Sequence, residues 1–204
     1  MRRRSTSDLH LGSAVIELLI PHRRPFLMVD AVVGFSAEPT PRIEAVRHVS
    51  MNEVYFDGHF PGMPLWPGAL TMEGLGQSAV ILQALVRLLR VAELQGREPE
   101  QLLEALRNLD RGFRLHPGYR AEGAGELLAA LRPAADEMAV GAAVDLKFLR
   151  PVFPGSRLDY VVELTDQLGD QMRFAAEATV ANEPVARGTI TGAVVARPTL
   201  PLTD

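Results

Sequence analysis

One stretch without proline limits the folds open to this chain more than any other. From Gly68 to Arg90 the sequence can form a single helix of about six turns. Apolar side chains fall on almost every side of that helix: Leu70, Met72, Leu75, Val80, Leu82, Leu85, Val86 and Leu89. A helix that is apolar all round is a buried helix. The sequence therefore predicts a central helix that the rest of the chain surrounds.

Strand-like runs lie on both sides of this helix in the sequence. Two of them precede it and four follow it: Val29–Phe35, Arg42–Val49, Met138–Leu149, Leu158–Leu164, Met172–Val180 and Val185–Ala196. Short turns rich in Pro, Gly and Asn separate neighbouring runs, which favours antiparallel pairing. We expect an α+β fold in which one antiparallel sheet wraps around the central helix.

A segment of different composition, at about residues 92–136, interrupts this pattern. It is rich in Glu, Arg, Leu and Ala, and it predicts helices near Pro99–Leu109 and Glu126–Leu131. Their leucines lie at helical spacing: Leu102, Leu103, Leu106, Leu127, Leu128 and Leu131. We expect this insertion to pack on the outside of the fold, near the C-terminal end of the central helix or at a subunit edge.

The whole chain has the size of one domain, and its composition excludes several classes of function. Its 204 residues predict a single domain over 1–204, with a basic tail at 1–13 and a short amphipathic helix after it. A net charge of −4 without a basic run disfavours nucleic acid as a partner. The absence of cysteine excludes thiol chemistry and is compatible with a cytoplasmic protein. We expect no run long and uncharged enough to span a membrane.

Two residues near the start of the central helix have side chains suited to acid–base chemistry. His59 lies in a loop rich in Gly and Pro that leads directly into the helix, and Glu73 lies in the second helical turn. Gln77, one turn further on, can hydrogen-bond to Glu73 and orient it. His59 and Glu73 each have a plain structural alternative. His59 could be a loop histidine with satisfied hydrogen bonds, and Glu73 could be a carboxylate that complements the helix dipole. The five histidines show no metal-binding spacing, and we expect no metal.

Several motifs resemble a known family, the 3-hydroxyacyl-acyl-carrier-protein dehydratases of fatty-acid synthesis. They are Pro21-His-Arg-Arg-Pro-Phe-Leu-Met-Val-Asp30, Val49-Ser-Met-Asn-Glu53, Gly58-His-Phe-Pro-Gly62, Pro67-Gly-Ala-Leu-Thr-Met-Glu-Gly-Leu-Gly-Gln77 and Lys147-Phe-Leu-Arg-Pro-Val-Phe-Pro-Gly155. The resemblance covers about residues 14–91 and 138–197. It implies a hotdog fold, with the central helix as the sausage, and a homodimer or higher homo-oligomer. The sequence departs from the family's pattern in the long insertion, at Gly74 and Gly76, and at Met63.

The resemblance also implies roles for individual residues. His59 and Glu73 would be the catalytic pair and would meet across the dimer interface. We assign His59 as the base, Glu73 as the acid, and Gln77 as the residue that orients Glu73. The backbone N–H of Gly68, at the helix start, would stabilise the developing enolate oxygen. No metal or organic cofactor is required.

An acyl carrier protein with a phosphopantetheine-linked acyl chain is the expected partner. Such carriers are acidic, so we expect a basic patch at the mouth of the substrate tunnel, with Arg23, Arg24, Lys147 and Arg150 as candidates.

Two alternative functions stay open. A hotdog acyl thioesterase would use the helix carboxylate to activate water. A non-catalytic subunit would partner an active homologue in a heterodimeric dehydratase. The His59 loop argues against the thioesterase, and the presence of both His59 and Glu73 argues against the non-catalytic subunit.

Overall fold

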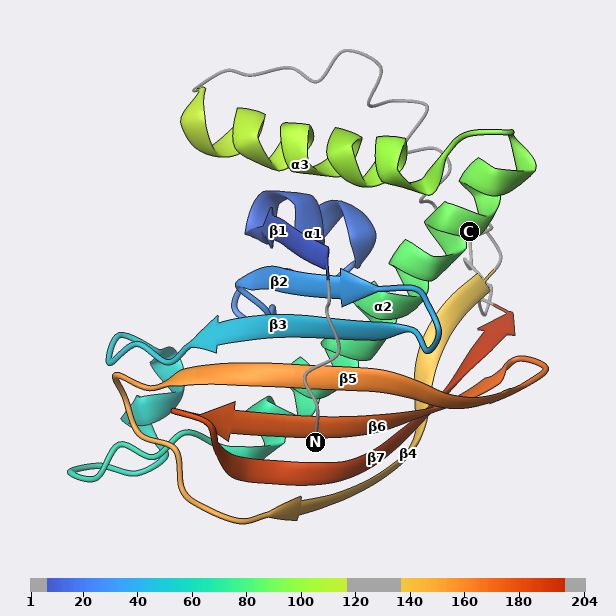
Figure 1. Cartoon of the computed structure of the whole chain (residues 1–204). Coiled ribbons are helices and arrows are strands. Elements are labelled where there is room, and N and C mark those ends of the chain that lie inside the picture. Colours follow the sequence, from blue (N-terminus) through green and yellow to red (C-terminus); the bar gives the residue numbers. More distant parts are fainter. Residues whose placement is uncertain (1–6, 117–136, 197–204) are drawn as a thin grey trace, which may run out of the picture.

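A seven-stranded antiparallel sheet wraps around one long helix in the computed structural model, which describes residues 7–116 and 137–196 (Figure 1). The strand order is β1-β2-β3-β5-β6-β7-β4. The elements along the chain are β1 (Ser7–Gly12), α1 (Ser13–Leu19), β2 (Ala31–Ser36), β3 (Arg42–His48), the 3-10 helix η1 (Val54–Asp57), α2 (Gly68–Leu94), α3 (Pro99–Leu115), β4 (Glu137–Phe148), β5 (Arg157–Leu168), β6 (Gln171–Val180) and β7 (Glu183–Ala196). This is the hotdog fold, and it confirms the predicted fold class.

Helix α2 is the predicted central helix. It begins at Gly68 as predicted and runs one turn beyond Arg90. Its buried side chains include Leu75, Ile81 and Leu85. Among the described residues it is the one helix long and apolar enough to cross a membrane, which the sequence was not expected to contain. The wrapping of the sheet around it accounts for that apolar character, because the core helix of a globular fold needs apolar side chains on most of its faces.

The inner face of the sheet supplies the other half of the core. Along β5, Leu158, Tyr160 and Val162 are buried and alternate with less buried residues, as the two-residue period of a strand requires. Tyr160 also explains why Gly74 is a glycine, because a Cβ atom added there would overlap the Tyr160 phenol group. A Cβ at Gly76, by contrast, would meet nothing within 4 Å. Close packing therefore accounts for Gly74 but not for Gly76.

The segment predicted as a basic tail, residues 1–13, contains a strand. Residues 7–12 form β1, which pairs with β2 in the register Ser7↔Phe35 and Leu11↔Val32. Leu9 and Leu11 are fully buried. The alternation of these two leucines with polar residues is the period-2 signal of a strand, and pairing with β2 satisfies the backbone groups. The short helix expected after the tail is α1.

The described part of the insertion is helix α3, which covers β1 and α1 on the outside of the fold (Figure 1). Its buried residues include Leu102, Leu103 and Leu106, as its helical spacing predicts. The Asp110 carboxylate is also buried: it accepts the Gly12 backbone N–H at 2.6 Å and Arg114 Nε at 2.7 Å. The second predicted helix, Glu126–Leu131, lies outside the described residues.

Candidate active site

The loop between β3 and α2 fixes the His59 ring by one short hydrogen bond. His59 Nδ1 lies 2.7 Å from the Leu65 carbonyl oxygen, and the His59 backbone N–H bonds to the Tyr55 carbonyl. A carbonyl oxygen can only accept a hydrogen bond, so Nδ1 carries the ring proton. Nε2 is then left with its lone pair. This is the tautomer in which a histidine can act as a base through Nε2.

A buried tryptophan holds this loop in place. Trp66 packs edge-on against Tyr55 and Phe56, with ring centroids 5.9 and 6.3 Å apart. Its backbone N–H bonds to the Val152 carbonyl, so the loop is also tied to the segment after β4. The Arg47 guanidinium lies 5.6 Å from the centre of the Trp66 ring, within the range of a cation–π contact. The loop that carries His59 is therefore fixed by the packing around Trp66.

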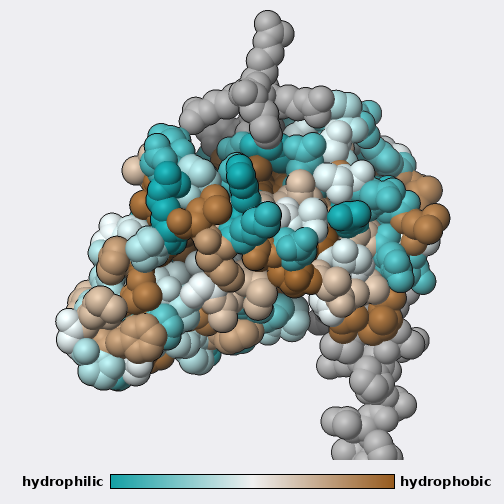
Figure 2. Space-filling model, turned by 90° about the horizontal axis from the view of Figure 1, so that it is seen from below, coloured by the Kyte–Doolittle hydropathy of each residue, from teal (hydrophilic) through white to brown (hydrophobic). Residues whose placement is uncertain are grey.

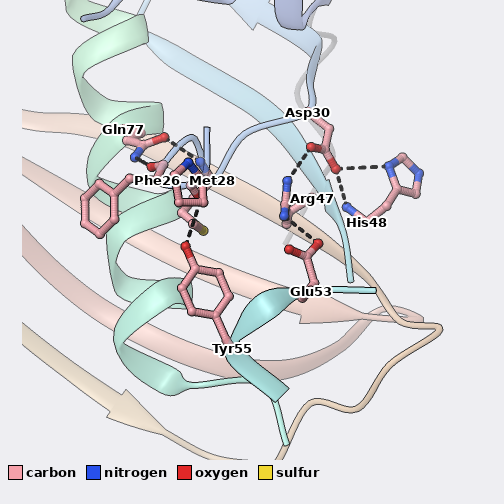
Figure 3. Close-up of polar contacts among 9 residues, drawn as sticks. Phe26, Met28, Asp30, Arg47, His48, Glu53, Tyr55 and Gln77 are labelled. Carbon is pink, nitrogen blue, oxygen red and sulfur yellow. Dashed lines mark hydrogen bonds and ion pairs between the residues drawn. The ribbon is translucent and has the colours of Figure 1, made fainter. Parts of the chain in front are cut away.

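An ion-pair network joins β3 to both flanking loops (Figure 3). Arg47 donates to Asp30 at 2.6 Å through Nη1 and to Glu53 at 2.6 Å through Nη2. The second Asp30 oxygen accepts the His48 backbone N–H at 2.6 Å. Such charge-assisted bonds are stronger than neutral ones. The network fixes the chain just before β2 and just before η1, on the two sides of the site.

Tyr55 links the His59 loop to the loop between α1 and β2. Its hydroxyl donates to the Pro25 carbonyl at 2.7 Å. Burial raises the pKa of Tyr55, the neighbouring Glu53 carboxylate raises it further, and Arg47 opposes both effects. The phenol therefore stays protonated at neutral pH and keeps this hydrogen bond.

Gln77 holds Glu73 as the sequence predicts. The fully buried Gln77 amide donates to Glu73 Oε1 at 2.9 Å and to the Phe26 carbonyl at 2.7 Å. Its own oxygen accepts the Met28 backbone N–H at 2.8 Å. These contacts, of which Figure 3 shows those to Phe26 and Met28, leave the amide one orientation. The Glu73 side chain itself is 27% exposed, so it can reach a bound molecule.

His22 is a neighbour of Glu73 that the sequence did not single out as a site residue. Its Nε2 lies 3.5 Å from Glu73 Oε1, and its ring stacks on Phe26. Its position in the Pro21–Asp30 motif was the only available signal. The contact itself depends on how the loop after α1 returns across α2, and no sequence spacing encodes that path.

A pocket of about 570 Å³ opens beside His59. It lies between the His59 loop, the start of α2 and the segment after β4, and its lining includes Gly68, Thr71, Phe148 and Arg150. A Cβ at Gly68 would lie 3.0 Å from the Phe148 ring, so glycine permits this close packing at the helix start. Gly68 is the first residue of α2, where backbone N–H groups have no partner within the helix. Such a group can serve as a donor to a bound oxygen.

One chain does not bring His59 and Glu73 together. Both residues are described, yet no ion pair joins them, and Glu73 does not line the pocket beside His59. His59 contacts Leu65 and Tyr55, whereas Glu73 contacts His22 and Gln77.

The four basic residues predicted at the tunnel mouth occupy different places. Arg150 lines the His59 pocket, and it bonds to the Pro184 carbonyl and to Glu183. Arg23 donates to the Ile20 and His22 carbonyls and pairs with Glu17, so it stabilises its own loop. Arg24 is exposed on that loop.

Lys147 lies apart from them. It lines a separate groove of about 450 Å³, together with Arg173 and Arg187. The structure therefore places Arg150 at the His59 pocket and Lys147 outside it.

Two family models match the chain. Residues 20–105 match the FabA-like domain, a stretch that contains His59, Glu73 and Gln77. Residues 121–198 match the fluoroacetyl-CoA-specific thioesterase, a stretch that contains none of these three.

Individual proteins extend the likeness over most of the chain. The 3-hydroxyacyl-acyl-carrier-protein dehydratase FabZ of Anaeromyxobacter sp. (strain K) is 34% identical over 171 residues, 84% of this chain and 82% of that protein. FabZ of Myxococcus xanthus (strain DK1622) is 30% identical over 87% of each chain. Among solved structures, the dehydratase heterocomplex ApeI:P from Xenorhabdus doucetiae matches with a TM-score of 0.51 and 14% identity, over 87% of this chain and 89% of that one. The last likeness concerns the fold alone. On the strength of the FabZ relatives, the chain belongs to the family of the 3-hydroxyacyl-acyl-carrier-protein dehydratases.

Proposed function

We propose that His59 and Glu73 carry out the reaction of this family, the removal of water from a 3-hydroxyacyl thioester to give the trans-2-enoyl thioester. His59 Nε2 takes the proton from C2 of the acyl chain. The electrons of that C–H bond are first delocalised onto the thioester carbonyl, whose oxygen becomes negative; they then form the C2=C3 double bond as the C3–O bond breaks. Glu73 gives its proton to the departing hydroxyl, which leaves as water. The Gly68 N–H stabilises the thioester oxygen while it carries negative charge.

The observation that carries this proposal is the contact between His59 Nδ1 and the Leu65 carbonyl oxygen. A proton on Nδ1, held by the Leu65 carbonyl at 2.7 Å, leaves Nε2 basic beside a pocket. A satisfied structural histidine would have both nitrogens in hydrogen bonds, whereas only Nδ1 of His59 has a partner among the described residues.

The two side chains would act on one substrate only if the site were shared between subunits. In one chain His59 and Glu73 do not meet. The proposal is therefore a homodimer or higher homo-oligomer in which Glu73 of one subunit faces His59 of the partner subunit. The Gln77 amide would keep Glu73 aimed at that shared site.

Turnover of 3-hydroxyacyl thioesters tests the assignment. Wild-type protein should interconvert a 3-hydroxyacyl-carrier substrate and its enoyl product, followed by ultraviolet absorbance. His59→Ala and Glu73→Gln should each lower kcat on the order of 10²- to 10⁴-fold while keeping the wild-type circular dichroism spectrum. His48→Ala is a matched control, because that exposed histidine lies on the far side of the Asp30 network. Full activity of either site variant would refute the assignment.

The same preparations separate the alternatives. A thioesterase would release free thiol from an acyl thioester, and the family model for residues 121–198 makes that assay worthwhile. A non-catalytic subunit would show no turnover when purified alone. Dehydration without thiol release favours the dehydratase.

The proposed partner is an acyl carrier protein, which docks where basic side chains flank the pocket. Of the four residues first considered, Arg150 is the best placed, because it lines the His59 pocket. Arg24 is exposed on the loop after α1, whereas Lys147 lies in the separate groove. The double variant Arg24→Glu/Arg150→Glu should raise KM for carrier-linked substrate and leave KM for a short pantetheine substrate unchanged. Lys147→Glu is the matched control. Equal effects on both substrates would contradict carrier docking at this face.

A further inference from the structure

The Glu73 carboxylate has one oxygen that is held and one that is free. Oε1 accepts a hydrogen bond from Gln77 Nε2 at 2.9 Å, and His22 Nε2 approaches the same oxygen to 3.5 Å. The two side chains come from different elements: Gln77 from α2, and His22 from the loop after α1. Among the described residues no contact is made to Oε2.

The surroundings of the His22 ring indicate which nitrogen carries the proton. A carboxyl oxygen that carries no proton is purely an acceptor, so a nitrogen facing it must carry a hydrogen. Nε2 faces Oε1, and Oε1 already accepts from Gln77. The other ring nitrogen, Nδ1, is buried and has no partner. A buried N–H without an acceptor is costly, so the Nε2–H tautomer fits this environment best.

We propose that His22 is a positioning residue for Glu73: its Nε2–H, together with the Gln77 amide, makes Oε1 an acceptor and leaves Oε2 as the oxygen that gives its proton to the substrate. The inference rests on the proposed function. When Glu73 is protonated, the acidic proton sits on Oε2, because two N–H groups point at Oε1. When the proton passes to the departing hydroxyl, the O–H bond at Oε2 breaks and its electrons stay on the carboxylate. Both donors then face a full negative charge.

The length of the His22 contact fits this role. At 3.5 Å it lies at the limit of a hydrogen bond in the free protein. A contact that is weak before the reaction and strengthens as charge develops on Glu73 stabilises the transition state more than the ground state. It therefore contributes to kcat and leaves KM unchanged.

The rest of the loop holds His22 in place without competing for Glu73. Arg23 donates to the His22 carbonyl at 2.8 Å and to the Ile20 carbonyl at 2.9 Å. Its charge is paired with Glu17 of α1. In one chain, His22 is thus the single titratable group that contacts Glu73 among the described residues. In the proposed dimer, His59 of the partner subunit faces the same carboxylate.

Two substitutions at His22 separate hydrogen-bond donation from shape. His22→Leu removes the donor, and we expect kcat to fall about 10- to 100-fold with KM unchanged, since a hydrogen bond to a charged group is lost. His22→Gln keeps an N–H near the position of Nε2, and we expect it to recover most of kcat. A merely structural change at His22 would not be reversed by His22→Gln, which restores the N–H but not the ring.

The matched control is His10, which also lies beside a carboxylate, Asp110, but on β1. His10→Leu and His10→Gln should leave kcat and KM unchanged. Thermal unfolding of every variant checks that it folds. Equal losses in His22→Leu and His22→Gln would overturn the proposal, and so would an unchanged kcat in both.

A double-mutant cycle with Glu73→Gln tests whether His22 acts through Glu73. We expect His22→Leu to cost nothing further in the Glu73→Gln background. An equal loss in both backgrounds would overturn the proposal while leaving the dehydratase assignment intact. Absence of turnover in the wild-type protein would instead overturn the proposed function itself. The two failures are therefore distinguishable.

Discussion

At the scale of single residues, Gln77 serves the fold and the site at once. Its amide joins Glu73 to the backbone of Phe26 and Met28. Gln77→Leu should therefore lower the free energy of unfolding by about 1–3 kcal/mol, since the buried Met28 N–H loses its partner. It should also lower kcat, because Glu73 is no longer oriented. Urea unfolding and turnover measure the two effects.

A second glutamine of the same helix provides the control for this substitution. Gln83 is half-buried, and its amide contacts the Met172 sulfur at 3.0 Å. Gln83→Leu should change both quantities little. Wild-type kcat in Gln77→Leu would show that Glu73 needs no orienting amide.

Tyr160 should make the free energy of unfolding depend on pH in the alkaline range. Its side chain is fully buried, and its hydroxyl has no partner among the described residues. Burial raises the pKa of Tyr160 far above its ordinary value of 10.0; Arg47 and Asp30 contribute less. Above pH 10.0 the unfolded chain therefore loses a proton that the folded chain keeps. The unfolded state then binds fewer protons, so the free energy of unfolding falls as pH rises.

The variant Tyr160→Phe should remove this dependence. At neutral pH it should be as stable as wild type or more stable, because a buried hydroxyl without a partner is costly. Its advantage over wild type should grow above pH 10.0. Urea unfolding at a series of pH values measures it. A constant difference between the two proteins would contradict a buried, protonated Tyr160.

At the scale of secondary-structure elements, the sequence predicts most of the fold and one of the two contacts that Glu73 makes. The central helix and six strands follow from period and composition, because each buries its side chains according to its own local pattern. Strand β1 was missed, because its only signal is the pair Leu9 and Leu11 beside a basic tail. The Gln77 contact was predictable, since both partners lie on one helix at i and i+4. The His22 contact was not, because it joins two elements whose packing no local pattern encodes.

One buried carboxylate links helix α3 to the end of β1. Asp110 accepts the Gly12 N–H at the start of α1 and the Arg114 side chain, and His10 lies 3.4 Å away. Asp110→Ala leaves the Gly12 N–H without a partner, so it should destabilise the docking of α3 by about 1–3 kcal/mol. Hydrogen exchange of β1 and α3 should then speed up, while kcat stays unchanged.

The exchange experiment distinguishes an outer cover from a functional element. Asp110→Asn is the milder variant, since its amide oxygen can still accept the Gly12 N–H. The helix packs on β1 and α1, away from the pocket beside His59. A loss of turnover that follows the loss of exchange protection would mean that α3 shapes the site.

At the scale of the whole molecule, the sheet has one covered edge and one open edge. Helix α3 lies over β1, whereas β4 pairs with β7 on one side only. On and after β4, Val144, Phe148, Leu149 and Phe153 are each more than 40% exposed. Strand β4 runs down the right side of Figure 1 and ends at the bottom, so its end faces the viewer in Figure 2, where hydrophobic groups are spread among hydrophilic ones. An open edge with exposed apolar residues is suited to association with another chain.

Mixed oligomers test whether the site is shared between subunits. If His59 and Glu73 act across an interface, the homodimers of His59→Ala and of Glu73→Ala are each nearly inactive. Unfolding and refolding the two together at equal ratio should give about half mixed dimers, by random pairing into a symmetric assembly. Each mixed dimer has one site with both lesions and one intact site. Activity should then recover to about a quarter of wild type, by the same pairing arithmetic.

Subunit exchange must be shown separately, for example by native mass spectrometry of a mass-tagged variant. A pair that shares one lesion, tagged and untagged Glu73→Ala, is the matched control and should recover nothing. If both side chains acted within one subunit, no intact site could form in any mixed dimer. Exchange without recovery would therefore place the catalytic pair in a single chain, and it would require a movement that brings His59 to Glu73 from the separate positions they now occupy.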